Sequence, residues 1–258
     1  MSRPVLLLAS LLACLPATGC LFHHAKSAPA AAAAAPRERS VDSLWTLGTR
    51  AYDRGNWNLA QRAFDLIGPV MLPTDPRYYR LHFYQGELFF LKGNQLQAVR
   101  EFRRVADERP DGPLAADALL RAGDAYADLW RGPELDPTYG ETAKTVYEEV
   151  GTRYAGTPAG GRAAIRLAAL NEKFALKEYK NALFYFKFKA YDSAILLFRS
   201  VIATYPRSSV VPDALERLVR SYQILGYKED VKETCAYIAQ YAPDPAGPAR
   251  LCPKGSGN

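Results

Sequence analysis

The chain has 258 residues, of which 48% are hydrophobic, 12% aromatic and 23% charged. This composition excludes a collagen-like, mucin-like or wholly disordered chain, and the length allows two compact domains or one elongated domain. The 33 basic and 27 acidic residues are mixed along the chain, so the net charge of +6 indicates solvated surfaces rather than nucleic-acid binding. No apolar run reaches the roughly 20 residues that a membrane-spanning helix needs.

Residues 1–19 have the pattern of a secretory signal peptide, because Arg3 precedes an apolar stretch that ends in small residues. The phrase ATGC, which ends at Cys20, resembles a bacterial lipobox, in which the Cys is acylated and becomes the new N-terminus. We therefore predict a lipid anchor at Cys20. The phrase LLAC fits the pattern equally well, but acylation at Cys14 would leave an unusually short signal. Leu21 is not Asp, so by the rule for Gram-negative lipoproteins the signal for inner-membrane retention is absent.

Two segments outside the body of the chain are rich in Ala, Pro or Gly. Residues 20–39 are expected to form the acyl anchor and a tether, and residues 243–258 a flexible tail. Outside the signal and the anchor, Cys235 and Cys252 are the remaining thiols, and in an oxidising compartment a disulfide between them would fix the tail. Cys235 also occupies an inward position that suits a free thiol. The sequence leaves both states open.

From residue 40 onward the chain repeats a unit of about 34 residues that is typical of tetratricopeptide helix pairs. In each unit a small residue on the first helix lets the second helix approach closely, and an aromatic residue fills the space between neighbouring pairs. Gly55, Gly93 and Gly226 follow first helices, where a positive φ ends the helix. We predict an all-α fold, an α-solenoid of about five tetratricopeptide repeats within 40–242, with approximate units 41–74, 79–112, 116–158, 175–208 and 212–243.

Three further features distinguish the individual repeats. A turn-rich insertion, WRGPELDPTY, interrupts the third unit. Between Arg162 and Tyr205 there is neither Gly nor Pro, which predicts one long helix to about Lys189 and a second helix from Tyr191 or Asp192. The phrase D-A-L-x-R occurs twice, and we expect its Asp to cap a helix and to pair with the Arg four residues on, as Asp117 with Arg121 and Asp213 with Arg217.

The Y-P-x-S helix exits, the D-A-L-x-R starts, the insertion and the lipobox together resemble the BamD family of outer-membrane lipoproteins of the β-barrel assembly machinery. The resemblance covers roughly residues 40–242. It implies a lipid-anchored protein at the periplasmic face of the outer membrane, which holds the periplasmic domains of the barrel-forming BamA subunit, receives unfolded outer-membrane proteins and works with other assembly lipoproteins. Two other repeat proteins are compatible: a pilotin-like lipoprotein for a secretin, and the periplasmic coordinator of the Tol–Pal system, against which Cys20 argues because the coordinator normally lacks a lipobox.

We expect binding surfaces at the two ends of the solenoid and no enzymatic activity, because no catalytic motif is present. With three His and four Cys, we expect neither a metal site nor a cofactor. His82 is expected to be a core or groove residue rather than a base. The candidates for binding the constitutive partner are the polar residues Lys187, Lys189, Asp192 and Arg199.

The candidates for binding unfolded substrates are Tyr78, Tyr79, Arg80, Phe83 and Tyr84. Aromatic rings beside guanidinium groups suit an aromatic-rich segment and the capture of a C-terminal carboxylate. The competing interpretation is that these rings belong to the core between repeats.

Overall fold

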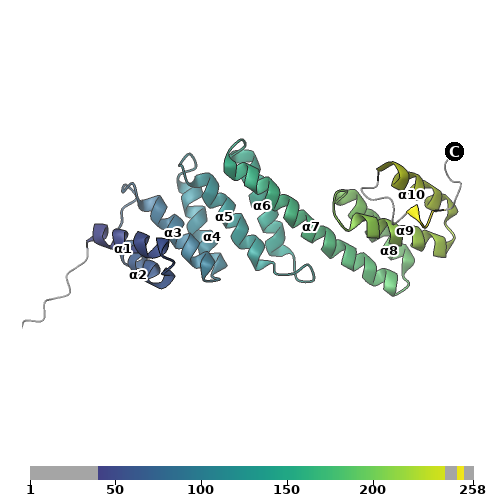
Figure 1. Ribbon diagram of the computed structural model, residues 1–258, viewed down its shortest axis with the longest axis horizontal. Helices are drawn as coiled ribbons and strands as arrows, with labels where there is room; N and C mark the ends of the chain where they lie inside the picture. The colour runs from purple at the N-terminus through teal and green to yellow at the C-terminus, as the bar shows by residue number, and fades with distance from the viewer. Residues whose placement is uncertain (1–39, 242–248, 253–258) are drawn as a thin grey trace, which may run out of the picture. The chain divides into compact units, whose positions relative to one another are not determined.

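The computed structural model describes residues 40–241 and 249–252, and the predictions for the signal, Cys20, the tether and most of the tail lie outside these ranges. All regular elements of the described part are helices, which confirms the all-α fold (Figure 1). The described residues contain no helix that is long and apolar enough to cross a membrane. The helices are α1 (Val41–Asp53), α2 (Trp57–Ile67), α3 (Tyr78–Leu91), α4 (Gln95–Glu108), α5 (Ala115–Leu129), α6 (Thr138–Arg153), α7 (Pro158–Lys187), α8 (Tyr191–Thr204), α9 (Val211–Leu225) and α10 (Lys228–Tyr241).

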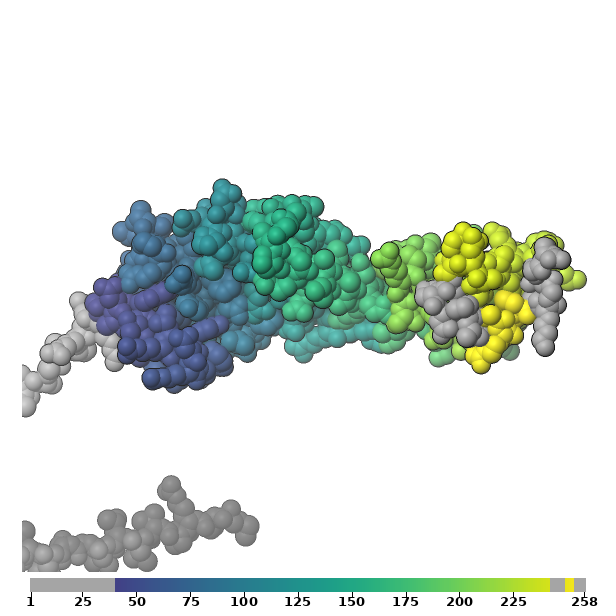
Figure 2. Space-filling model, turned by 45° about the horizontal axis from the view of Figure 1, so that its top comes forward, coloured from purple at the N-terminus to yellow at the C-terminus, as the bar shows by residue number. Residues whose placement is uncertain are grey.

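Within the compact unit that contains these helices, each helix packs chiefly against the helices that precede and follow it in the chain. The colours of the described residues succeed one another with little mixing in the space-filling view (Figure 2). Buried apolar residues form three clusters in chain order, centred on Phe64, Phe102 and Phe198. A row of antiparallel helix pairs that bury only neighbouring faces is an α-solenoid, as predicted.

Small residues on the first helix of a pair admit a large ring from the second helix. A Cβ atom added to Gly86 would lie 2.7 Å from the Phe102 ring, so only glycine permits this approach. The corresponding distances are 2.4 Å between Gly48 and Phe64 and 2.7 Å between Gly123 and Tyr147. The small-plus-aromatic pattern of the sequence is therefore the contact that closes each of these pairs.

The paired Asp and Arg side chains that D-A-L-x-R predicts do not form, and this prediction is wrong. Neither α5 nor α9 has a side-chain cap, and Asp117 forms its ion pair with Arg162 of α7. Arg121 instead reaches the preceding repeat, where its Nη2 lies 2.9 Å from Oε2 of Glu87 and its Cζ lies 4.2 Å from the centroid of the Phe90 ring.

Arg217 occupies the equivalent position in the last repeat, and its Cζ lies 5.3 Å from the centroid of the Phe186 ring. Both arginines contact a ring on the first helix of the preceding repeat, and Arg121 also pairs with Asp124 of its own helix at 3.0 Å. Among the described residues, neither arginine pairs with the Asp four residues before it.

Helix α7 spans 30 residues and joins the third repeat to the fourth. It begins at Pro158, four residues before the predicted stretch, because Thr157 caps its first turn and Pro158 suits the first helical position. It also fixes the insertion of the third repeat. The ammonium groups of Lys173 and Lys177 donate to carbonyl groups of residues 130–135, and Lys180 pairs with Glu134.

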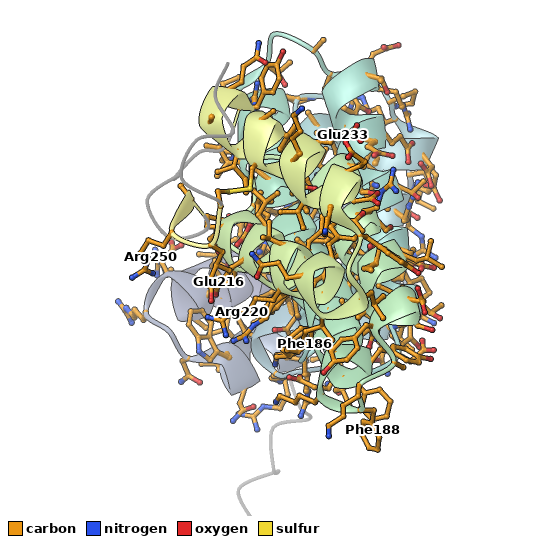
Figure 3. All side chains as sticks on the ribbon, turned by 90° about the vertical axis from the view of Figure 1, so that its right-hand side faces the viewer. Phe186, Phe188, Glu216, Arg220, Glu233 and Arg250 are labelled. Carbon is orange, nitrogen blue, oxygen red and sulfur yellow. A yellow bond between two sulfur atoms is a disulfide. The ribbon has the colours of Figure 1, made fainter. Side chains whose placement is uncertain are left out.

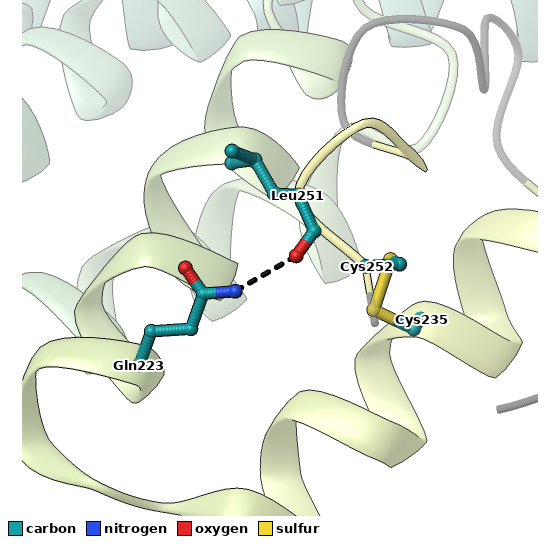
Figure 4. The surroundings of a disulfide bond; sticks show 4 residues. All are labelled: Gln223, Cys235, Leu251 and Cys252. Atoms are coloured by element: carbon teal, nitrogen blue, oxygen red, sulfur yellow. Dashed lines mark hydrogen bonds between the residues drawn. A yellow bond between two sulfur atoms is a disulfide. The ribbon is translucent and has the colours of Figure 1, made fainter. Parts of the chain in front are cut away.

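Cys235 of α10 and Cys252 form a disulfide with a Cα–Cα distance of 5.7 Å (Figure 4). Of the two states that the sequence left open, the bonded one is present. The Nε2 of Gln223 on α9 also donates a hydrogen bond of 2.7 Å to the carbonyl oxygen of Leu251.

Candidate partner-binding surfaces

The turn between α7 and α8 exposes large apolar side chains. Phe188 is 70% exposed, Leu196 69% and Phe184 54%, whereas Ala182 of the same segment is fully buried. The rings of Phe184 and Phe188 are one helical turn apart and lie 4.5 Å apart, so they form one aromatic face. A hollow of about 590 Å³ beside it is lined by Phe184, Tyr185, Leu196 and three further residues of α7 and α8. In Figure 3 Phe188 projects away from the helices.

Lys187 and Lys189 flank these rings. Both are exposed, and no ion pair involves either of them among the described residues. We call the set Phe184, Tyr185, Phe188, Leu196, Lys187 and Lys189 the α7–α8 turn surface. It combines unpaired positive charge with exposed apolar area, which is the composition of a protein-binding patch.

Lys189 has a backbone φ of 60°, a conformation that favours glycine. Gly55, Gly93 and Gly226 occupy the equivalent turns of other repeats, with φ values of 72°, 77° and 77°. A lysine at this position costs roughly 1 kcal/mol relative to glycine. Glycine at position 189 would make the fold more stable, but the α7–α8 turn carries a positively charged lysine there.

The other two predicted partner residues lie elsewhere. Asp192 accepts a hydrogen bond of 3.2 Å from the hydroxyl of Tyr227, and this contact raises the pKa of Tyr227. Arg199 lines a cavity of about 290 Å³ between α8 and α10, over a floor contributed by α9. The structure therefore brings Lys187 and Lys189 together but assigns Arg199 to a separate surface.

The cavity next to Arg199, which we call the α8–α10 groove, is lined by Arg199, Tyr222, Asp230, Glu233, Tyr237 and apolar neighbours. Burial raises the pKa of the Tyr222 hydroxyl, while Arg199 acts in the opposite direction. No ion pair involves Asp230 or Glu233 among the described residues. In Figure 3 Glu233 lies in the upper part of the view and Phe188 near the bottom.

The predicted substrate residues do not form a single aromatic face. Tyr84 stacks on Phe64 with ring centroids 5.5 Å apart, in the core between the first two repeats. Phe83 packs edge-on against Phe102 at 5.6 Å, and Tyr78 packs against Tyr79 and the buried His82. These rings are half-buried, so much of their area serves packing between helices, in line with the competing interpretation.

Tyr79 and Arg80 do share a cavity. It has a volume of about 120 Å³ and is lined by both residues together with Arg109, Pro113 and neighbouring residues. The guanidinium of Arg109 lies 5.7 Å from the centroid of the Tyr79 ring, and Arg80 is exposed. A ring beside one guanidinium group, with a second arginine lining the same cavity, retains the chemistry expected for a carboxylate-terminated segment.

His82 and Glu101 form a buried pair, with Nδ1 of the histidine 2.7 Å from Oε2 of the glutamate. Burial opposes ionisation of Glu101, but the hydrogen bond to His82 and the charges of Arg104 and Arg100 outweigh it and lower the pKa of the carboxyl. His82 is thus the core residue that the sequence predicted. The described residues contain no group of three or more His, Cys, Asp or Glu side chains that could hold a metal ion.

The sequence predictions missed the exposed rings of the α7–α8 turn surface. The four-residue spacing of Phe184 and Phe188 indicates that the two rings share one helix face, but it does not indicate whether that face is buried.

The described helices form pairs that are stacked in one row, and small-to-aromatic contacts close three of these pairs. In four of these described pairs a left-handed residue joins the two helices, and these features together define a tetratricopeptide-type repeat protein. Its candidate sites are surfaces between or at the ends of helices.

The family model for YfiO, described as an outer membrane lipoprotein, matches residues 37–237, so the chain belongs to this family. The outer membrane protein assembly factor BamD of Caulobacter vibrioides is 27% identical over 206 residues, which cover 80% of this chain and 67% of the relative. BamD of Rickettsia prowazekii is 29% identical over 204 residues, covering 79% and 81% of the two chains. The resemblance to BamD is thereby confirmed.

Among solved structures, the tetratricopeptide domain of P58(IPK) aligns with a TM-score of 0.43 and 15% identity, over 78% of this chain and 50% of that one. The fold assignment depends on the helix packing described above.

Proposed function

We propose that the chain is a non-catalytic scaffold of outer-membrane β-barrel assembly, which binds the periplasmic domains of a BamA-like protein and unfolded outer-membrane proteins. Family membership and the two BamD relatives, named as assembly factors, support this role. The observation that carries it is the α7–α8 turn surface, where two lysines that have no ion pair with any described residue flank exposed rings.

The chemistry of this surface defines the complementary partner. Phe184, Phe188 and Leu196 offer apolar area that water leaves on association, and Lys187 and Lys189 favour carboxylates at the rim. The periplasmic domain of the partner would therefore present an apolar side chain flanked by Asp or Glu. Arg199 in the α8–α10 groove adds a second contact.

Unfolded substrates bind at the other end of the solenoid in this proposal. The cavity of Tyr79, Arg80 and Arg109 accommodates the C-terminal carboxylate of an outer-membrane protein, and the ring stacks on its terminal aromatic residue. Tyr78, Phe83 and Tyr84 do not line this cavity, and their rings pack between helices instead.

Acylation at Cys20 would hold the scaffold at the periplasmic face of the outer membrane. One acyl chain binds a membrane weakly, and two or three anchor it stably. The description of the family as outer membrane lipoproteins supports this location.

The test is binding of the purified periplasmic region of the BamA-like protein from the same organism to the double variant K187E/K189E. We expect a loss of about tenfold or more in affinity, because charge reversal places like charges at the interface. Lys92→Glu is the matched control, since Lys92 is an exposed lysine at the corresponding turn of the second repeat. Unchanged binding by K187E/K189E would refute the site, and co-purification with a secretin instead of the BamA-like protein would favour the pilotin-like alternative.

A further inference from the structure

The last repeat departs from the packing rule of the others. Its second helix carries Cys235 at the position of the rings Phe64, Phe102 and Phe198, sixteen residues after a residue on the first helix. That first-helix residue is glycine or alanine in the other pairs with this spacing, but it is Val219 here, fully buried. A ring at position 235 would therefore meet the Val219 side chain, and a smaller residue is required.

Among the described residues, no further helix packs on the outer side of α10. α10 buries Val231, Cys235 and Ile238, whereas α9 buries seven residues. A terminal repeat without a following pair is the least stabilised element of a solenoid and normally needs a cap.

The segment 249–252 supplies that missing contact. Leu251 and Cys252 pack against the same apolar cluster as Val219 and Cys235, and Gln223 binds the Leu251 carbonyl (Figure 4). The disulfide therefore joins α10 to a segment that α9 also holds. Leu251 and Cys252 are half-buried and pack against the cluster that contains Cys235, the residue at the position where other repeats carry a ring.

We propose that the Cys235–Cys252 disulfide is a redox-dependent strap that replaces the missing aromatic and fixes α10, so that the α8–α10 groove exists only in the oxidised chain. The groove depends on it because Asp230, Glu233 and Tyr237, which form one wall, are all on α10. Any role of the groove in partner binding rests on the proposed function, but the strap itself does not.

Forming the strap requires a disulfide-carrying oxidant. The two thiols lose two protons and two electrons as the Cys235–Cys252 bond forms. The disulfide of the oxidising protein takes up these electrons and protons and is reduced to two thiols. Such oxidants belong to the secretory compartments that the signal sequence implies.

The test is hydrogen exchange of the full mature chain, oxidised and after reduction with dithiothreitol. We expect amide exchange in α10 to accelerate by up to about 100-fold on reduction, since the bond joins residues with a sequence separation of 17. Exchange in α3 and α4 should not change. Cys252→Ser should match the reduced wild type and should not respond to the reductant.

A second variant tests the packing argument even if Cys252→Ser folds poorly. The triple variant V219A/C235F/C252A restores the small-plus-aromatic pair, and we expect it to recover most of the α10 protection without a disulfide. Equal α10 exchange in oxidised and reduced wild type would overturn the strap, and failure of the triple variant to recover protection would overturn the substitution of the ring. Reduction that accelerates exchange in α10 but leaves binding of the BamA-like region unchanged would support the strap. The same result would contradict a role of Arg199 in partner binding.

Discussion

The junction between repeats two and three (α3–α6) and the junction between repeats four and five (α7–α10) have equivalent helix arrangements. The side chains that hold the two junctions together differ in their chemistry. At the first, Arg121 is held by Glu87, Asp124 and the Phe90 ring, and Arg103 bridges α4 to Glu149 of α6 at 3.1 Å. At the second, the counterpart of Arg121 is Arg217, which stacks on Phe186 and forms no ion pair with a carboxylate in the described part of the chain.

The contacts between the second helices of the two junctions differ in the same way, because an ion pair is present at the first junction and an open cavity at the second. Arg199 is the counterpart of Arg103, but the residue opposite it is Tyr237 rather than a glutamate, and a cavity of about 290 Å³ remains open. The comparison shows that the first junction uses its charges for cohesion, whereas the second leaves Arg199, Asp230 and Glu233 available and relies on aromatic packing and a disulfide. This division is what we expect where the second junction serves binding.

The largest difference between the junctions should appear when the equivalent arginines are removed. Arg121→Ala leaves the Glu87 carboxylate, which is only 14% exposed, without its partner, and we expect a loss of about 2–3 kcal/mol in the free energy of unfolding. Arg217→Ala removes a cation–π contact and should cost about 1 kcal/mol. Urea unfolding of both variants measures the difference.

Glu87→Gln combined with Arg121→Ala is the control for this comparison. It should recover part of the lost stability, because the buried charge is gone. Equal losses for Arg121→Ala and Arg217→Ala would show that the two junctions do not differ as described.

These arginines also show where sequence reasoning reaches its limit. The contacts of Gly86 with Phe102 and the turn at Gly226 follow from residue types at fixed spacing within one repeat, so the fold was predictable. Arg121 chooses among partners up to 34 residues away, and that choice depends on how two repeats pack. The exposed rings of Phe184 and Phe188 escaped prediction for the same reason, since only the packed structure shows which apolar face has no neighbour.

A smaller effect is expected at the turn that carries Lys189. Lys189→Gly relieves the positive φ of 60°, and we expect a stabilisation of roughly 0.5–1 kcal/mol, visible as a higher Tm. The same substitution removes a charge from the α7–α8 turn surface and should weaken partner binding. Gly93→Lys is the reciprocal variant and should destabilise the second repeat. A Tm that is unchanged or lowered in Lys189→Gly would contradict the assigned strain.

The smallest expected effect is the dependence of the folding stability on acidic pH. Glu101 of the second repeat has a pKa below its ordinary value of 4.5, so its ionised form stabilises the folded chain above that pH. This contribution is lost as the pH falls through the lowered pKa. Glu101→Gln should therefore be less stable than the wild type at pH 7, and the difference should shrink below about pH 4.5. Unfolding measured from pH 7 to pH 3 checks this, and a difference that stays constant over the range would contradict it.

The central claim is that the surfaces left open near the C-terminal end bind the constitutive partner. The most direct measurement is a hydrogen-exchange footprint of the wild-type chain with the periplasmic region of the BamA-like protein. The account predicts slower exchange at the end of α7 and along α8, over residues 184–199, with α3 and the cavity of Tyr79 and Arg80 unaffected. Protection confined to α1–α4, with residues 184–199 unchanged, would contradict it.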